Sequence, residues 1–286
     1  MQQLSLFESH QYSSNTAVPL RSPFRYPGGK TWLVPRIRSW LASQEVPPIE
    51  FIEPFAGGGI VSLTVAFEQL AHHVTIAELD ADVAAVWLTM LSPEAEWLAN
   101  QIAAFDFAPD TVNYILSQRN ISTKEKAFQT ILKNRINRGG IIAPGAGKIK
   151  LGEQGKGLKS RWYPETLKKR ILDIMSIREK ISFIRGDGIE VLLQNVSRTD
   201  AVFFIDPPYS DAGKKAGKRL YKHWEINHEQ LFDIVSRLKG NFLMTYDNTE
   251  EVRQRAHRYG FAVEAVPMKN AHHAPMTELL IKNNAG

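Results

Sequence analysis

Short apolar runs, rich in β-branched and aromatic residues, alternate along the chain with segments of helical periodicity. The runs predict strands over residues 51–52, 74–77, 181–184, 201–205 and 241–245, and a late hairpin from residues 262–268 and 278–282. The intervening spacing predicts helices over residues 60–69, 189–195, 229–238 and 250–259. Alternating strands and helices indicate an α/β fold, with a mostly parallel sheet that is covered by helices on both faces.

The alternation stops between residues 92 and 180, where helical patterns surround a Gly-rich stretch at residues 145–157. The simplest interpretation is an insert that splits one α/β domain in sequence. Residues 21–91 and 181–286 would then form a discontinuous domain, and residues 92–180 a mainly helical second unit. Residues 1–20 contain several Ser and Gln residues and are expected to be a flexible N-terminus.

Composition excludes several classes of protein. The 286 residues include no cysteine, which excludes disulfides, thiolate metal sites and a cysteine nucleophile. A cytosine carbon-5 methyltransferase normally needs that nucleophile and is therefore disfavoured. No stretch approaches the roughly 18 apolar residues of a membrane span, so we expect no membrane association. The N-terminus also lacks the basic-then-apolar pattern of a signal peptide, and nothing points to secretion.

Positive charge is concentrated in two segments. The chain carries a net charge of +5, yet residues 133–180 contain 13 basic and four acidic residues, and residues 211–223 contain five basic and one acidic residue. Such clustering indicates a polyanion partner and favours nucleic acid. A solvated face of a basic protein is the alternative.

The sequence Asp206-Pro207-Pro208-Tyr209 directly follows the predicted strand 201–205. The two prolines fix φ and remove backbone donors, so the chain must leave the sheet stiffly with Asp206 at the strand's carboxyl end. Ligands of open α/β sheets bind at that edge. The set suits a planar ring with an amino group: Asp206 and the Pro207 carbonyl accept its hydrogens, and Tyr209 stacks on its face. A rigid turn without chemistry is the alternative interpretation.

A glycine-rich loop, Glu53-Pro54-Phe55-Ala56-Gly57-Gly58-Gly59, lies between a predicted strand and an apolar helix. Glycines there allow close approach of the backbone to a ligand, although the spacing differs from G-x-G-x-x-G. After the next strand comes Glu78, whose carboxylate can accept from both hydroxyls of a ribose. This order of elements indicates a nucleoside cofactor. Upstream, the turn Tyr26-Pro27-Gly28-Gly29-Lys30 would bring Tyr26 and Lys30 near a ligand, where Lys30 could pair with a carboxylate.

With these pieces in order, the sequence from about Pro23 to the C-terminus resembles Dam-type DNA adenine-N6 methyltransferases. The resemblance implies a Rossmann-like methyltransferase fold with a late antiparallel strand, S-adenosyl-L-methionine (AdoMet) as cofactor, and a target-recognition region in residues 92–180. It implies double-stranded DNA as partner, a cytoplasmic location close to bacterial or phage DNA, and a link to restriction-modification. The target site, a cognate restriction enzyme and the oligomeric state cannot be inferred from the sequence.

The resemblance also assigns residues. It implies a catalytic turn of Asp206, Pro207 and Tyr209, without a metal. It implies cofactor contacts that group around the glycine loop and the strand ends: Tyr26, Lys30, Phe55, Gly57, Gly59, Glu78, Asp187 and Asp206. The family often has Asp at the position of Glu78, and the insert departs from the family's pattern, which leaves the target sequence open.

Within the insert, basic residues interleave with glycines and aromatics, a composition that can clamp phosphates and read or stack bases. We expect Lys148 and Lys150 to contact phosphates, Arg138 to read a base, and Arg161 to contact DNA. The Arg161-Trp162 pair could equally be a packed joint beneath the next helix.

The expected reaction is methyl transfer from AdoMet to the N6 amine of an adenine flipped out of DNA. Three alternatives stay open. An RNA adenine or DNA cytosine-N4 methyltransferase could use the same turn, and a catalytically inactive DNA-binding protein could retain the fold. A nicotinamide-dependent dehydrogenase is the weakest, because it would leave the motif at residues 206–209 unexplained.

Overall fold

The computed structural model describes residues 18–26, 28–150, 152, 155–208, 225–269 and 275–284. Within these residues the strands form one seven-stranded sheet in the order β3-β2-β1-β4-β5-β7-β6. The first five strands of that order are parallel, and β7 runs antiparallel to both β5 and β6. Their bounds are β1 (Glu50–Glu53), β2 (His73–Glu78), β3 (Ile181–Arg185), β4 (Ala201–Ile205), β5 (Phe242–Asp247), β6 (Ala262–Lys269) and β7 (Pro275–Lys282).

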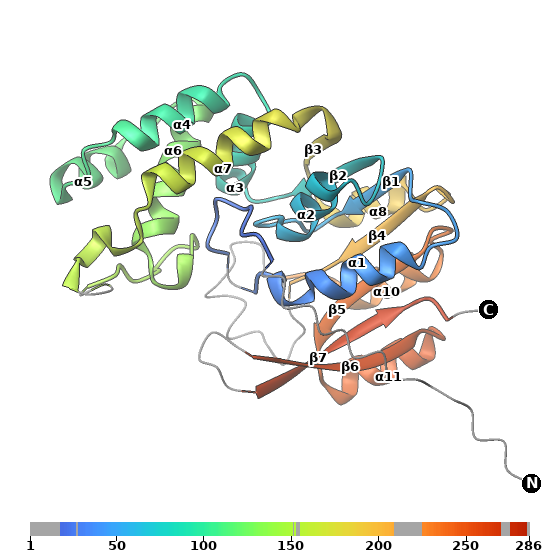
Figure 1. The fold of residues 1–286 in the computed structure, drawn as a ribbon. Helices are drawn as coiled ribbons and strands as arrows, with labels where there is room; N and C mark the ends of the chain where they lie inside the picture. The colour runs from blue at the N-terminus through green and yellow to red at the C-terminus, as the bar shows by residue number, and fades with distance from the viewer. Residues whose placement is uncertain are drawn as a thin grey trace, which may run out of the picture.

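The buried strands of the sheet contribute side chains to two hydrophobic clusters, one on each face. Side chains alternate along a strand, so Val202 and Phe204 of β4 join one cluster while Phe203 and Ile205 join the other. The first face is covered by α1 (Val34–Ala42), α2 (Ile60–Glu68) and α3 (Ala81–Met90). The second is covered by α8 (Gly188–Gln194), α10 (His228–Ser236) and α11 (Glu250–Arg258) (Figure 1).

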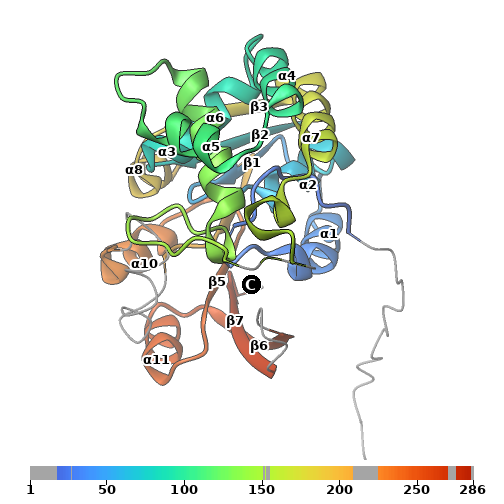
Figure 2. The same cartoon turned by 90° about the vertical axis from the view of Figure 1, so that its left-hand side faces the viewer.

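Residues 92–180 are mainly helical, as predicted. They form α4 (Ala95–Ala104), α5 (Pro109–Ser117), α6 (Thr123–Ile136) and α7 (Pro164–Ser176), together with the short 3-10 segments η2 (Arg138–Gly140), η4 (Gly157–Arg161) and η5 (Arg178–Lys180). Figures 1 and 2 show the four helices together beside α3, at the end of the sheet opposite β6 and β7. Their apolar residues continue the cluster of the first sheet face, so this segment shares a core with the α/β part.

Trp162 is 9% exposed and packs against Phe105, Phe107 and Phe128, with ring centroids 5.2 to 6.5 Å away. This contact favours the packed-joint interpretation for Trp162. A buried ring among three others is not available to stack on a base.

The predicted strands and helices are all found, with bounds that differ by at most three residues and an exact match for the strand at residues 201–205. The helix predicted over residues 60–69 ends at Glu68 because Gln69 adopts a left-handed conformation. The fold class is therefore confirmed: a Rossmann-like, mostly parallel sheet with an antiparallel part. Among the described residues no helix is both long and apolar enough to span a bilayer.

Candidate active site

One cavity of about 1010 Å³ lies at the carboxyl ends of β1, β2 and β4 and beside the start of α8. Its wall contains nine of the residues predicted to bind cofactor or act in catalysis: Tyr26, Lys30, Phe55, Gly57, Gly59, Glu78, Asp187, Asp206 and Pro207. The cavity continues to the helical segment, where Arg135, Gly139, Tyr163 and Arg170 line it. Tyr209 and the basic Lys214–Lys222 stretch lie outside the described residues. The fold thus brings these nine predicted residues together around one cavity, while their individual roles stay predictions.

The glycine loop between β1 and α2 is held between two aromatic rings. Gly57 and Gly59 have φ angles of 49° and 59°, a region that favours glycine. A Cβ on Gly57 would lie 2.5 Å from the Tyr26 ring, and one on Gly59 would lie 2.5 Å from the Trp87 ring. The Trp87 indole N–H also donates to the Gly57 carbonyl at 2.9 Å. A side chain at either position would collide with Tyr26 or Trp87, so the packing of these two rings itself requires glycine there.

Glu78 is the last residue of β2, Asp187 follows the neighbouring parallel strand β3, and both lie at the same edge of the sheet. Glu78 accepts from the backbone N–H groups of Gly57 at 3.0 Å and Asp80 at 2.7 Å. Burial raises the pKa of Glu78 to about 7. Asp187 caps α8 by accepting from the Ile189 N–H at 2.9 Å, and it is exposed. Two carboxylates thus face the cavity from strand ends β2 and β3.

Asp206 is held from two sides immediately after β4. Lys30 Nζ lies 3.0 Å from Asp206 Oδ1, and the Thr245 hydroxyl donates to the same oxygen at 2.6 Å. Lys30 also donates to the Gly28 carbonyl at 3.1 Å and lies 3.7 Å from Glu278 Oε2. Lys30 therefore pairs with two carboxylates of the protein itself.

Two buried glutamates of this site were not identified from the sequence as functional candidates. Glu53, the last residue of β1, accepts from the backbone N–H and the hydroxyl of Ser62. Burial raises its pKa to about 8. Burial likewise raises the pKa of Glu278 on β7 to about 7. For Glu278 the available signal was its place at the start of the second predicted hairpin strand, directly before the apolar residues 279–281.

Asn134 of α6 joins the helical segment to the loop that carries Tyr26 and Lys30. It is fully buried, accepts from the Arg25 N–H at 2.8 Å, and donates to the carbonyls of Arg25 at 3.0 Å and Gly140 at 2.6 Å. Gly140 has a φ of 77°, and a Cβ there would lie 1.9 Å from the Arg25 carbonyl oxygen. The contact requires glycine at this position.

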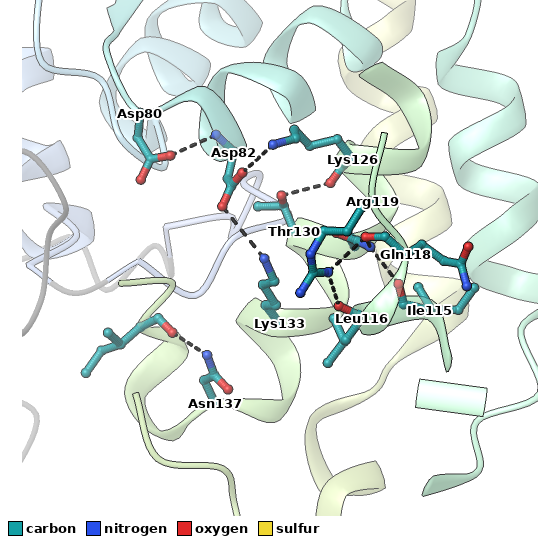
Figure 3. A network of polar contacts seen from close by, with 12 residues as sticks. Asp80, Asp82, Ile115, Leu116, Gln118, Arg119, Lys126, Thr130, Lys133 and Asn137 are labelled. Atoms are coloured by element: carbon teal, nitrogen blue, oxygen red, sulfur yellow. Dashed lines mark hydrogen bonds and ion pairs between the residues drawn. The ribbon is translucent and has the colours of Figure 1, made fainter. Parts of the chain in front are cut away.

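A second connection runs from the loop after β2 to the same helix (Figure 3). Asp80 caps α3 by accepting from the Asp82 N–H at 2.8 Å. The Asp82 carboxylate lies 3.1 Å from Lys126 Nζ and 3.8 Å from Lys133 Nζ, both on α6. The first turn of α3, four residues after Glu78, is therefore joined by ion pairs to α6.

The residues predicted to contact DNA lie on and beside a loop that follows α6. Arg138, Lys148 and Lys150 are exposed, and Arg161 is half-buried at the end of η4. The loop is closed by a bridge between Asn137 and Lys148, with the Arg138 N–H donating to the Gly147 carbonyl at 2.8 Å. Lys148 Nζ donates to Asn113 Oδ1 at 3.2 Å. Gly139 and Gly140 line the cavity, so this loop lies at its rim.

The side chains around the cavity fit a nucleoside that carries an amino-acid group. Glu78 and Asp187 provide acceptors for hydroxyl and amino groups, Tyr26 and Phe55 are aromatic, and the Lys30 cation is paired with Asp206 and Glu278. With the sheet order and the late antiparallel strand, this set is that expected of an AdoMet-dependent methyltransferase. The family model for D12 class N6 adenine-specific DNA methyltransferases matches residues 26–266. The chain belongs to this family, and its cofactor is AdoMet. The predicted family, enzyme class and cofactor are confirmed.

Solved structures that are similar to the chain include other methyltransferases, all at low identity. A SAM-dependent methyltransferase from Agrobacterium tumefaciens is 9% identical, with 88% of this chain and 61% of that chain covered and a TM-score of 0.41. The rRNA methyltransferase AviRa from Streptomyces viridochromogenes is 12% identical, with 90% and 86% covered and a TM-score of 0.40. TYW2 from Pyrococcus horikoshii in complex with MeSAdo is 11% identical, with 86% and 60% covered and a TM-score of 0.34. Comparison with curated proteins gives no match.

Proposed function

We propose that the protein transfers a methyl group from AdoMet to the N6 amine of an adenine that is flipped out of double-stranded DNA, at a specific sequence. The observation that carries this proposal is the fixed Asp206 carboxylate at the cavity wall, held through Oδ1 by Lys30 and Thr245. Membership of an adenine-specific family supports the choice of acceptor.

The exocyclic amine of adenine is a poor nucleophile because its lone pair is delocalised into the ring. Asp206 and the carbonyl of Pro207 accept the two hydrogens of this amine, which favours a tetrahedral nitrogen with an available lone pair. Bound AdoMet supplies an electrophilic methyl group. The N–C bond forms as the S–C bond breaks, and the nitrogen then loses one proton toward Asp206. Alignment and charge placement account for the catalysis, without a covalent enzyme intermediate.

Cofactor binding is assigned to the residues around the glycine loop. Glu78 accepts from the ribose hydroxyls, and Asp187 and Phe55 lie on the side of the adenine. Tyr26, Gly57 and Gly59 form the adjoining wall. Lys30 lies beside Asp206, where its ammonium group holds the catalytic carboxylate in place.

Residues 92–180 are proposed as the target-recognition unit, and residues 21–91 with 181–286 as the catalytic unit. The excess of basic residues in 133–180 and the exposed Arg138, Lys148 and Lys150 beside the cavity support this division. Extrusion of the base costs a few kcal/mol. Stacking on Tyr209 would return about 1–3 kcal/mol.

Methylation mapping of DNA from cells that express the protein tests this function. The expected result is N6-methyladenine at one short sequence. Purified protein should methylate unmodified duplex DNA and leave RNA unmodified, as nucleoside analysis of both products would show. N4-methylcytosine as the product, or transfer to RNA alone, would replace the proposed substrate by one of the two related amine acceptors.

A further inference from the structure

A buried ammonium group between two carboxylates forms a cluster at the catalytic edge of the sheet. Lys30 is 3% exposed, and its Nζ lies 3.0 Å from Asp206 Oδ1 and 3.7 Å from Glu278 Oε2. The proposed chemistry uses Asp206 directly and Lys30 as its partner. It gives no task to Glu278, although this residue also lines the cavity.

Glu278 reaches the site through the antiparallel part of the sheet. It lies in β7, opposite Asp247 of β5 on one side and Val266 of β6 on the other. Glu278 is 6% exposed, and within the described residues its Oε2 atom makes no hydrogen bond. A buried carboxylate costs free energy unless a cation compensates for its lost hydration. An apolar residue at this buried strand position would avoid that cost. The presence of a glutamate paired with Lys30 therefore requires an explanation.

We infer that Glu278 is a positioning residue for methyl transfer: its carboxylate holds the Lys30 ammonium in place, and Lys30 in turn fixes Asp206 through Oδ1. This inference rests on the proposed function, because it assumes that Asp206 receives the amine. Glu278 and the Gly28 carbonyl contact Lys30 independently of Asp206. Lys30 therefore keeps its place while the hydrogen bonds of Asp206 change during the reaction.

The protonation of Glu278 controls this contact. Lys30, Asp206 and Asp247 are the charged groups that act on it, and Val266 on β6 is apolar. Burial and the two aspartates raise the pKa of Glu278 to about 7, whereas Lys30 opposes that rise. The ionised form attracts the ammonium and the protonated form does not. Positioning of Lys30 should therefore improve as the pH rises through about 7.

The test compares Glu278→Gln with the parent and with Glu264→Gln as matched control. Glu264 is an exposed residue of the neighbouring strand β6, and it pairs with Arg36 on the surface. The single-turnover rate is measured at saturating AdoMet and DNA from pH 5.5 to 9, with AdoMet affinity from calorimetry and the melting temperature as separate readouts. Glu278→Gln should lower the rate at pH 8 by about tenfold or more. It should also flatten the rise near pH 7, with AdoMet affinity within about twofold of the parent. Glu278→Asp should recover part of the rate, and the control should match the parent.

A second readout does not depend on activity. Nitrogen NMR of the lysine side chains should show a Lys30 signal that shifts with pH near 7 in the parent and loses this shift in Glu278→Gln. An unchanged rate profile and an unchanged Lys30 titration would overturn the inference. A lower melting temperature with a parent-like pH profile would also overturn it, by assigning Glu278 a structural role only. Failure of the proposed function would instead be seen in the methylated nucleoside made by the parent.

Discussion

Nζ of Lys30 lies 3.0 Å from Oδ1 of Asp206, so the loop that leads into α1 and the turn after β4 meet in one ion pair. The two residues are 176 positions apart in the chain. This contact anchors the Asp206 carboxylate to the loop that carries Lys30. It also leaves the rest of that side chain oriented by two fixed contacts, one from Lys30 and one from Thr245.

Asp206→Ala should abolish methylation while the fold and most of the AdoMet affinity remain. The substitution removes an acceptor that acts on the amine, at a strand end outside the hydrophobic clusters. Single-turnover assays and calorimetry on the same preparation check both parts. Methyl transfer within tenfold of the parent, a loss below about 1.4 kcal/mol, would contradict the catalytic assignment.

Glu78→Ala should weaken AdoMet binding. Removal of this acceptor typically costs about 1–3 kcal/mol for each buried donor left unsatisfied, and here it would release the Gly57 and Asp80 N–H groups. Calorimetry measures the affinity, with Glu96→Ala on the exposed surface of α4 as control. Equal affinity of Glu78→Ala and parent would remove Glu78 from the cofactor site.

Glu53→Gln should make stability less dependent on pH. The pKa of Glu53 is raised to about 8 in the folded protein, so the folded state binds a proton that the unfolded state releases near pH 4.5. The stabilisation by this proton is complete below about pH 4.5 and is lost as the pH rises to about 8. The melting temperature of Glu53→Gln relative to the parent should therefore increase between pH 5 and pH 8. A constant difference across that range would mean that Glu53 is ionised in the folded protein.

The Lys148→Ala, Lys150→Ala double variant should bind all DNA sequences more weakly, because both lysines are exposed beside the cavity. Each lost phosphate contact should reduce the slope of log affinity against log salt by about 1. Arg138→Ala should instead cost about 1–3 kcal/mol at the target site and little elsewhere. Titrations at several salt concentrations separate the two effects. If the double lysine variant keeps the parent's salt slope, residues 148 and 150 do not contact phosphates, and the basic stretch Lys214–Lys222 becomes the leading candidate.

Trp162→Ala should destabilise the protein by about 3–5 kcal/mol, as is typical for truncation of a large buried ring. The ring contacts Phe105, Phe107 and Phe128. Tyr163→Ala is the matched control, because Tyr163 is 47% exposed. Chemical denaturation measures both. A small loss of stability in Trp162→Ala together with a large loss of DNA affinity would restore the DNA-contact interpretation.

The sequence was sufficient to predict the strands and the residues at their carboxyl ends, because both follow from local pattern and from the geometry of parallel sheets. Glu278 could not be assigned in this way. Its approach to Lys30 depends on the antiparallel register that places it opposite Asp247, and local sequence does not determine that register. Likewise, the motif at residues 53–59 predicted a ligand loop, but not that its glycines would contact Tyr26 and Trp87. Such contacts depend on which distant rings the fold brings to the loop.

The Asn134 contact sets a condition for any exchange of target specificity between relatives. Its three hydrogen bonds join α6 to the backbone of Arg25 and to Gly140, so a graft of residues 92–180 would replace one half of a buried polar joint. A donor segment without an amide at this position would leave the Arg25 N–H and carbonyl without their present partners. A chimaera should therefore retain Asn134 and Gly140 from the recipient, with the junction placed on the solvent side of α6. Residues 92–180, if they recognise the target as proposed, are thus interchangeable only outside this joint.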